Sequence, residues 1–338
     1  MLSPHLQTPL KIGSVILHSR VFQSPLSGVS DRAFRQLVRR YAPDSMLYTE
    51  MVHAAGLCHA HQLKKVMDVS PQDQPISIQL FDCRPDFMAE AARMAVDEGA
   101  LTIDINMGCP VNKVTKKGGG SSLLRDPETA RAIVRTVAAA VPVPVTVKTR
   151  IGWDDTEVNA VDFALRMQAA GAQMLTLHGR TRAQGYRGSA RWEWIAKVKA
   201  ALEIPVIANG DIFSAAAAAR CLEQTGADGV MCSRGTLGYP FLVGEIDHFL
   251  KTGQERSPVT IADRLRCAAE HLELLWRYKG QRGIYQSRKH MSWYVKGFEG
   301  AAALRSKLTR IESLAEGQAL LAAALEHFDR EMAISATT

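Results

Sequence analysis

Short apolar runs alternate, up to about residue 252, with segments whose apolar positions recur at helical spacing. The runs typical of strands are, in order, 21–22, 46–48, 76–80, 101–105, 143–147, 174–177, 204–208 and 229–231. Each of them is followed by a polar or glycine-containing turn. Eight strands that alternate with helices over about 250 residues predict an α/β protein, a (β/α)8 TIM barrel.

Helix boundary signals support this alternation. Asp126 and Pro127 are the residue types expected at the N-cap and the first position of a helix. Three helical segments close on a glycine just before a strand run, at Gly99, Gly171 and Gly226. A doubly wound open sheet shares the alternation, but its first strand normally leads into a GxGxxG turn, which is absent after residue 22. The barrel is therefore the favoured fold.

The strand pattern ends near residue 252, and helical patterns follow. Linker residues occur at 251–253 and 257–258, and Leu265, Leu272 and Leu275 then share one helix face. Residues 314–328 form a second amphipathic pattern. We therefore expect a barrel domain over residues 1–252 and a helical domain over residues 258–332.

Composition excludes several classes of protein. With 46% hydrophobic and 22% charged residues, the chain is neither disordered nor collagen-like. Its six cysteines form no CxxC pair and show no Cys/His spacing typical of zinc, so we expect no metal and a reducing compartment. Neither a signal peptide nor an apolar run long enough for a membrane helix is evident. The expected location is cytoplasmic, without a membrane partner.

Positive charge gathers in the helical part of the chain. The chain has 41 Lys and Arg against 34 Asp and Glu, and residues 277–310 alone contain nine basic residues and one acid. Tyr278, Tyr285, Trp293, Tyr294 and Phe298 are interleaved with them. A solvated helix face would also be charged, but this density with interleaved aromatics favours a nucleic-acid-binding surface.

The last two strand ends carry residues suited to phosphate, which barrels commonly bind there. The seventh run leads into Asn209, Gly210 and Asp211, and the eighth leads into Ser233, Arg234 and Gly235. Glycine lets backbone N–H groups approach a phosphate closely, and arginine offers it a forked guanidinium. Either loop alone could be a plain turn, but together they predict a phosphorylated ligand.

Other strand ends are also polar. A lysine at a buried strand end is costly to desolvate, so we expect Lys148 to meet an anionic partner. A flavin would provide one, since its reduced ring carries charge near N1 and the C2 carbonyl, and Gln79 could bond its pyrimidine edge. His178 suits either a structural histidine or a site residue, and its place beside Arg180 favours the site.

A long loop follows the fourth strand run, over residues 106–124. It carries Cys109, whose ordinary pKa of about 8.5 suits a general acid. A nucleophile and an inert thiol remain alternatives. Lys113, Lys116 and Lys117 follow closely and place positive charge beside the thiol.

Seven motifs occur together and in order: PLSGVSDRAFR at 25–35, DINMGCPVNKV at 104–114, GGGSS at 118–122, VKTRIGW at 147–153, LHGRTR at 177–182, IANGDI at 207–212 and RKHMSWY at 288–294. With them the chain resembles the flavin-dependent tRNA-dihydrouridine synthases and is most similar to the bacterial B-type group. Leu26 stands where the family usually has methionine, and Ser233 stands where it commonly has glycine.

The resemblance implies that reduced FMN, regenerated by NADPH, delivers hydride to C6 of a tRNA uridine while Cys109 protonates C5. The residues then expected to hold FMN are Pro25, Leu26, Ser27, Gln79, Lys148, His178, Asn209, Gly210, Asp211, Ser233, Arg234 and Gly235. The residues expected to contact tRNA are Asn106, Lys113, Lys116, Lys117, Arg180, Arg182, Arg288, Lys289, His290 and Lys296. The target base must leave its stack to reach a barrel site.

Three other functions remain open from the residues alone. A flavin barrel that reduces a small molecule shares the phosphate loops but leaves the basic helical part without a role. A Schiff-base aldolase could use Lys148 and would need no bound chromophore. An RNA-binding protein on an inactive barrel would not need Cys109 or Lys148.

Overall fold

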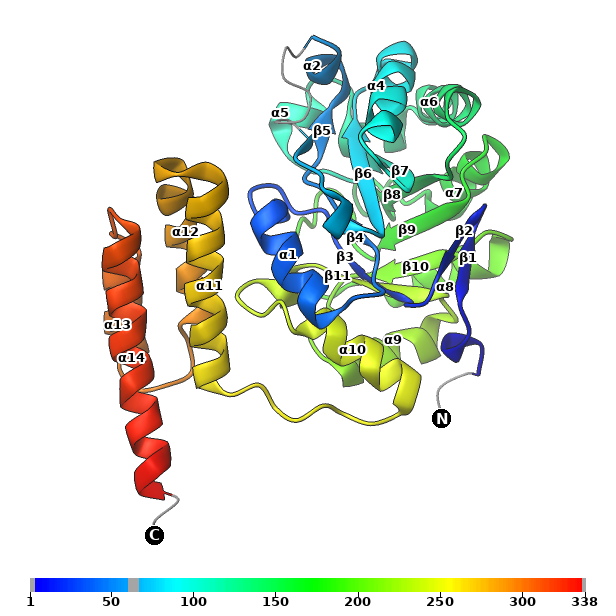
Figure 1. The fold of residues 1–338 in the computed structure, drawn as a ribbon. Coiled ribbons are helices and arrows are strands. Elements are labelled where there is room, and N and C mark those ends of the chain that lie inside the picture. Colours follow the sequence, from blue (N-terminus) through cyan, green and yellow to red (C-terminus); the bar gives the residue numbers. More distant parts are fainter. Residues whose placement is uncertain (1–3, 60–66, 336–338) are drawn as a thin grey trace.

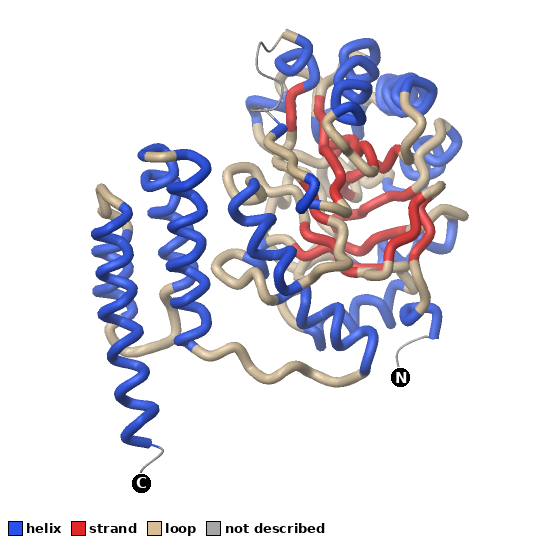
Figure 2. The backbone as a smooth tube through the Cα atoms, viewed as in Figure 1, coloured by secondary structure: helices blue, strands red, loops and turns tan. Residues whose placement is uncertain are grey.

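The computed structural model describes residues 4–59 and 67–335 (Figures 1 and 2). Residues 1–3 and 60–66 of the expected barrel segment therefore lie outside the described residues. Within the described part, eight parallel strands follow one another around a barrel: β3 (Val21–Gln23), β4 (Leu47–Tyr48), β6 (Ile76–Phe81), β7 (Thr102–Met107), β8 (Val145–Arg150), β9 (Met174–His178), β10 (Val206–Asn209) and β11 (Gly229–Cys232). The expected barrel is confirmed.

The barrel strands are ordered β3-β11-β10-β9-β8-β7-β6-β4. At the seam between the first and last of these, the backbone N–H of Gln23 donates to the carbonyl of Met46 at 3.1 Å. All ladders along this path are parallel, so every strand delivers its carboxyl end to the same face of the barrel.

The sequence pattern does not predict a separate two-stranded sheet and one short strand of the barrel sheet. A hairpin of β1 (Leu10–Ile12) and β2 (Val15–Leu17) precedes the barrel, and β5 (Val52–His53) pairs with β6. The buried residues of the hairpin pack with Phe22, Met46 and Met174 in one apolar cluster. Strands of two or three residues are too short to show a reliable alternation, so they were not expected.

Helices surround the sheet, as Figure 1 shows. The barrel helices are α1 (Arg32–Tyr41), α2 (Ala54–Cys58), α4 (Pro85–Asp97), α5 (Asn112–Thr115), α6 (Pro127–Ala140), α7 (Ala160–Ala169), α8 (Trp192–Ala201), α9 (Ala215–Thr225) and α10 (Leu242–Thr252). Short 3-10 helices are η1 (Pro4–Gln7), η2 (Pro71–Asp73), η3 (Gly120–Arg125) and η4 (Arg234–Thr236). The main apolar core lies between this helical shell and the strands.

Four further helices stand beside the barrel (Figure 1). They are α11 (Ile261–Lys279), α12 (Gln281–Tyr294), α13 (Ala301–Leu308) and α14 (Leu314–Ser335). Ala33 and Leu37 of α1 pack into the same apolar cluster as Leu272 and Leu275 of α11, so the helices rest on the barrel through α1. The chain between α10 and α11 contains no helix or strand.

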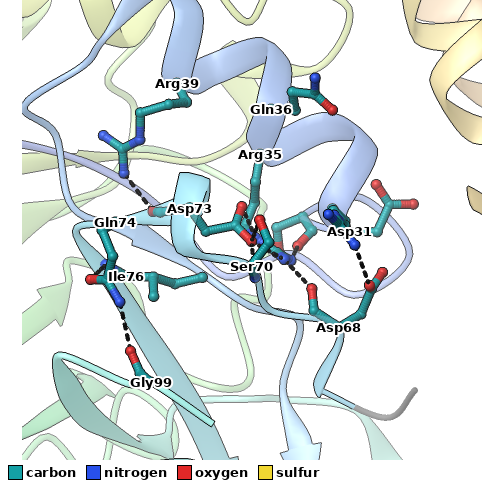
Figure 3. A network of polar contacts seen from close by, with 12 residues as sticks. Asp31, Arg35, Gln36, Arg39, Asp68, Ser70, Asp73, Gln74, Ile76 and Gly99 are labelled. Carbon is teal, nitrogen blue, oxygen red and sulfur yellow. Dashed lines mark hydrogen bonds and ion pairs between the residues drawn. The ribbon is translucent and has the colours of Figure 1, made fainter. Parts of the chain in front are cut away.

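A buried ion pair anchors α1 to η2 (Figure 3). The Arg35 guanidinium donates two hydrogen bonds of 3.1 Å to the carboxylate of Asp73 and a third, of 3.0 Å, to the carbonyl of Ser30. Arg35 is only 1% exposed. Because α1 follows directly on the 25–31 loop, this anchor also positions one edge of the barrel mouth.

Candidate active site

A cavity of about 450 Å³ opens at the carboxyl ends of the strands. Every residue expected to hold FMN lines it: Pro25, Leu26, Ser27, Gln79, Lys148, His178, Asn209, Gly210, Asp211, Ser233, Arg234 and Gly235. Cys109 and Asn106 line the same cavity. Residues from loops far apart in the sequence are therefore brought to one site, because parallel strands all end on this face.

Gly210 allows the close packing that forms the β10 end of the cavity. Its φ is +118°, and an added Cβ would lie 2.8 Å from Cβ of Ala190 and 3.0 Å from Cδ2 of His178. Next to it, Asn209 donates from Nδ2 to the carbonyl of Met231 at 2.8 Å and to the hydroxyl of Ser233 at 3.1 Å. The two expected phosphate loops are thus joined by a hydrogen bond.

Basic side chains line the cavity, and burial lowers the pKa of three of them, Lys148, Arg150 and His178. Lys148 donates from Nζ to Oδ1 of Asn209 at 3.1 Å, and burial, assisted by Arg150, lowers its pKa to about 8. Burial also lowers the pKa of Arg150 to about 10. The pKa of His178 is well below its usual range, because the ring is buried and faces Arg150 and Lys148, so the imidazole is neutral.

The carboxylate of Asp211 pairs with two arginines at the cavity, Arg180 and Arg234. Asp211 accepts from Arg180 at 2.7 Å and from Arg234 at 3.0 Å, and it also accepts from the backbone N–H of Ala190 at 2.7 Å. Asp211 is held with φ +59°, a left-handed conformation that is uncommon for residues other than glycine. Since Lys148 and Arg150 lie nearby as well, the cavity has more cationic than anionic groups and suits an anionic ligand.

The Cys109 loop is held by side chains on both sides. The backbone N–H of Cys109 donates to Oδ1 of Asn106 at 2.9 Å. The carbonyl of Cys109 accepts from the backbone N–H and the hydroxyl of Ser121, at 3.1 and 2.9 Å. Burial raises the pKa of the Cys109 thiol, so it carries a proton at neutral pH. A protonated thiol at a cavity wall is available as an acid.

The residues expected to contact tRNA differ in how exposed they are. Lys113, Lys116, Lys117, Lys289 and Lys296 are exposed, and Asn106 lines the cavity. Arg182 donates to Asn112 at 3.0 Å, and Arg288 donates to the carbonyl of Ile311 at 2.9 Å. Arg180 and His290 are each 1% exposed, so the structure does not bring their side chains to the surface.

Other cavity residues were not singled out as site residues from the sequence. Tyr186 and Phe213 are half-exposed at the cavity, and the Arg234 guanidinium lies over both rings, 4.6 and 5.5 Å from their centroids. Trp293 of α12 also lines the cavity, so the helical region contributes to the wall. Isolated aromatics in loops have no periodic signal, and Trp293 belongs to a segment interpreted only as tRNA surface.

Metal and membrane features are absent from the part of the chain that the structure describes. No group of three or more His, Cys, Asp or Glu in residues 4–59 and 67–335 could hold a metal ion. Across the same residues, no helix combines the length and the apolar character that crossing a membrane requires.

The fold and the cavity together define a TIM-barrel enzyme whose site at the strand ends suits an anionic ligand and offers a thiol proton. A family model described as dihydrouridine synthase (Dus) matches residues 22–332. The chain belongs to this family, and it is therefore an oxidoreductase. The expected resemblance is confirmed.

Individual relatives agree with the family. A probable tRNA-dihydrouridine synthase 1 from Synechocystis sp. is 71% identical over 313 residues, 93% of this chain and 88% of the relative. The tRNA-dihydrouridine synthase B of Xanthomonas axonopodis pv. citri is 40% identical over 321 residues, 95% of this chain and 96% of the relative.

Two solved structures share the fold at low identity. A histamine dehydrogenase from Rhizobium sp. 4-9 is 16% identical, with a TM-score of 0.56 over 80% of this chain and 51% of that one. A morphinone reductase variant in complex with tetrahydroNAD is 15% identical, with a TM-score of 0.54 over 78% of this chain and 94% of that one.

Proposed function

We propose that this protein reduces the C5=C6 bond of specific uridines in tRNA, with FMN as cofactor and NADPH as reductant, and with Cys109 as the proton donor. The observation that carries the proposal is that the Cys109 loop borders the same cavity as the two phosphate-compatible loops. The names of the relatives point to the same substrate and product.

The residues of the cavity fit FMN. Its volume lies within the range of small-ligand sites, about 300–1,000 Å³. Arg234 offers a guanidinium beside the turn of Gly210 and Asp211, so this end suits the phosphate. Gln79 and Lys148 would hold the ring, where a cation favours the reduced form. When bound, FMN supplies the hydride that goes to C6.

The thiol completes the reaction. The C5=C6 double bond becomes a single bond when C6 gains a hydride and C5 gains a proton. Cys109 gives this proton from Sγ and regains one from solvent, because its raised pKa favours the protonated form. The loop hydrogen bonds to Asn106 and Ser121 hold the backbone of Cys109 in place for this transfer.

Exposed lysines would receive the tRNA. Lys113, Lys116 and Lys117 follow the thiol on α5 and the turn after it. Lys289 of α12 lies against Gly28, next to the cavity residue Ser27. Lysines on both the barrel and the helical region can therefore contact phosphates close to the mouth, while the target base, turned out of its stack, enters the cavity.

Cys109→Ala tests the proposed role of the thiol. We expect the purified variant to keep flavin absorbance and tRNA binding, and to lose about 10²–10⁴-fold of dihydrouridine formation, the usual contribution of a general acid. Cys83→Ala is the matched control, because Cys83 is also half-buried but does not line the cavity. Loss of flavin from Cys109→Ala, or unchanged turnover, would contradict the assignment.

The substrate and the reductant need separate assays. Wild-type protein is expected to form dihydrouridine in tRNA transcripts with NADPH, and tRNA binding is expected to weaken steeply as salt rises. Reduction of a free pyrimidine with no effect of tRNA would instead favour a small-molecule reductase. A colourless protein that binds no FMN would overturn the cofactor assignment.

A further inference from the structure

A chain of buried hydrogen bonds joins the barrel interior to the Cys109 loop. Thr146 donates to Oδ1 of Asp104 at 2.6 Å, and Gln79 donates from Nε2 to Oδ2 of Asp104 at 2.7 Å. Asn106 donates from Nδ2 to Oε1 of Gln79 at 2.8 Å. Oδ1 of Asn106 then accepts the backbone N–H of Cys109 at 2.9 Å, as well as that of Gly108 at 3.1 Å.

Strand register brings these side chains together. Gln79 of β6 is the partner of Asp104 of β7, and Asp104 is in turn the partner of Thr146 of β8. Asp104 and Asn106 are two residues apart on β7, so they point to the same face of the strand. Asp104 and Thr146 have no exposed surface, and Gln79 and Asn106 are 1% and 8% exposed.

Asp104 fixes the direction of these hydrogen bonds at their buried end, and the backbone N–H groups of Gly108 and Cys109, which can only donate, favour the same direction at the loop end. An ionised carboxylate can only accept hydrogen bonds, whereas a side-chain amide can donate from one end and accept at the other. Facing the carboxylate, Gln79 must present Nε2 to it, and therefore turns Oε1 toward Asn106. Asn106 must then present Nδ2 to Gln79, which leaves Oδ1 for the N–H groups of the Cys109 loop.

We propose that Asp104 is a positioning residue: it orients the Gln79 and Asn106 amides so that Asn106 always offers an acceptor to the Cys109 loop. The same orientation leaves the second N–H of the Gln79 Nε2 group free of the carboxylate, as a donor toward the cavity. The Asp104 carboxylate therefore orients both the acceptor that holds the Cys109 loop and the Gln79 donor that is available to a ligand. This inference rests on the proposed role of Cys109.

The charge state of Asp104 is compatible with this role. Burial raises its pKa to about 6, against the opposing effects of the hydrogen bonds from Thr146 and Gln79 and of the charge of Lys148. At neutral pH the carboxyl is therefore mostly ionised and accepts only.

Asp104→Asn is the first test, because it keeps the shape but removes the fixed direction. An amide at position 104 can donate to Oε1 of Gln79, which would reverse both following amides and turn Nδ2 of Asn106 against the loop N–H groups. We expect dihydrouridine formation to fall about 10²-fold, the scale of a small misplacement of a reacting group. Alkylation of Cys109 by iodoacetamide, followed by peptide mass spectrometry, should accelerate as the loop loosens.

Thr102→Val is the matched control. Thr102 lies two residues before Asp104 on β7, is 1% exposed, and its hydroxyl has no hydrogen-bond partner among the residues that the structure describes. We expect this variant to keep the wild-type rates of turnover and of Cys109 alkylation. Alkylation of Cys58, a half-buried thiol of α2, serves as an internal reference in every variant. Equal behaviour of Asp104→Asn and Thr102→Val would overturn the proposal.

A double variant makes the test independent of loss of folding. In Asp104→Asn/Gln79→Glu the carboxylate stands at position 79 instead of 104. There it can only accept from Asn106 Nδ2, so Asn106 Oδ1 again faces the Cys109 loop. Cys109 alkylation should return to the wild-type rate, while FMN binding weakens because position 79 no longer offers an N–H. Accelerated alkylation in a folded double variant would overturn the proposal. Because alkylation needs neither tRNA nor turnover, this result is separable from failure of the proposed function.

Discussion

Lys148 directs its ammonium toward Asn209, and the 3.1 Å hydrogen bond between Nζ and Oδ1 joins β8 to β10 at the floor of the cavity. Within the protein the hydrogen-bond acceptor of Lys148 is thus a neutral amide, and the anionic partner expected from the sequence, a flavin, stays a prediction. The amide of Asn209 is itself held by its bonds to Met231 and Ser233. The lysine charge therefore remains available to a ligand.

This arrangement predicts a lower flavin midpoint potential in Lys148→Met. The ammonium stabilises the reduced ring, which carries negative charge, so its removal should shift the potential by at least about −30 mV, or roughly 1.4 kcal/mol for two electrons. Anaerobic dye-equilibrated titration of the FMN-loaded protein at pH 7 measures the shift. An unchanged potential would contradict a role of Lys148 at the ring.

The contribution of the Lys148 ammonium to the flavin midpoint potential should itself depend on pH. The pKa of Lys148 is about 8, so the ammonium is present below that pH and is lost as the pH rises through it; a bound anion moves this loss upward. The difference in potential between wild type and Lys148→Met should therefore be largest at pH 7 and shrink above the lysine pKa. If the difference in midpoint potential stayed constant between pH 7 and pH 10.5, the charge of Lys148 would not be its cause.

The sequence was informative about the cavity because barrel geometry converts strand ends into neighbours. Once the runs ending near Gln79, Lys148 and His178 are recognised as parallel strands, their next polar residues must share one face. The hydrogen bond between Gln79 and Asp104 was not predictable in this way. It depends on the register of two strands 25 residues apart, which the apolar pattern of each strand alone does not determine.

The position of the helical region was also beyond the sequence pattern. Amphipathic spacing indicates that α11 has a buried face, but not that this face meets α1. The contribution of Trp293 to the cavity wall follows from that docking. Similarly, the charge pattern of 288–296 predicts one basic surface, whereas the tertiary packing buries His290 and leaves Lys289 and Lys296 exposed.

The buried pair of Arg35 and Asp73 should be important for stability. Asp73→Ala leaves the Arg35 guanidinium buried without its carboxylate, and we expect a loss of about 3–5 kcal/mol in the free energy of unfolding. Urea denaturation measures this loss. Arg93→Ala breaks the exposed pair with Glu90 on α4 and should cost about 0–1 kcal/mol. Similar costs for the two variants would contradict the importance of burial.

Exposed lysines of α12 and the segment after it should contribute to tRNA binding through charge alone. Lys289→Gln/Lys296→Gln should weaken tRNA binding and reduce the slope of log affinity against log salt by about 1 per lysine. Filter binding over a range of salt concentrations measures both effects. NADPH oxidation without tRNA should be unaffected, since neither side chain lines the cavity.

Lys197→Gln is the control for this surface, because Lys197 is exposed on α8, on the side of the barrel away from α11–α14 (Figure 1). It should leave tRNA affinity and salt dependence unchanged. Equal weakening by Lys197→Gln would mean that tRNA responds to net charge rather than to the α12 surface.

Gly120 should be required for the position of Cys109. Its φ is +59°, and an added Cβ would lie 2.8 Å from the carbonyl oxygen of Cys109. Gly120→Ala should therefore displace the thiol loop, lower turnover and keep FMN bound. Gly226→Ala is the matched control, because Gly226 has a similar φ of +64° but no atom of the described residues lies within 4 Å of the added Cβ. Gly226→Ala should lose about 1–2 kcal/mol of stability through the left-handed conformation, Gly120→Ala should lose more because of its additional close contact, and only Gly120→Ala should change turnover and Cys109 alkylation. Wild-type turnover in a folded Gly120→Ala protein would show that the loop tolerates the displacement.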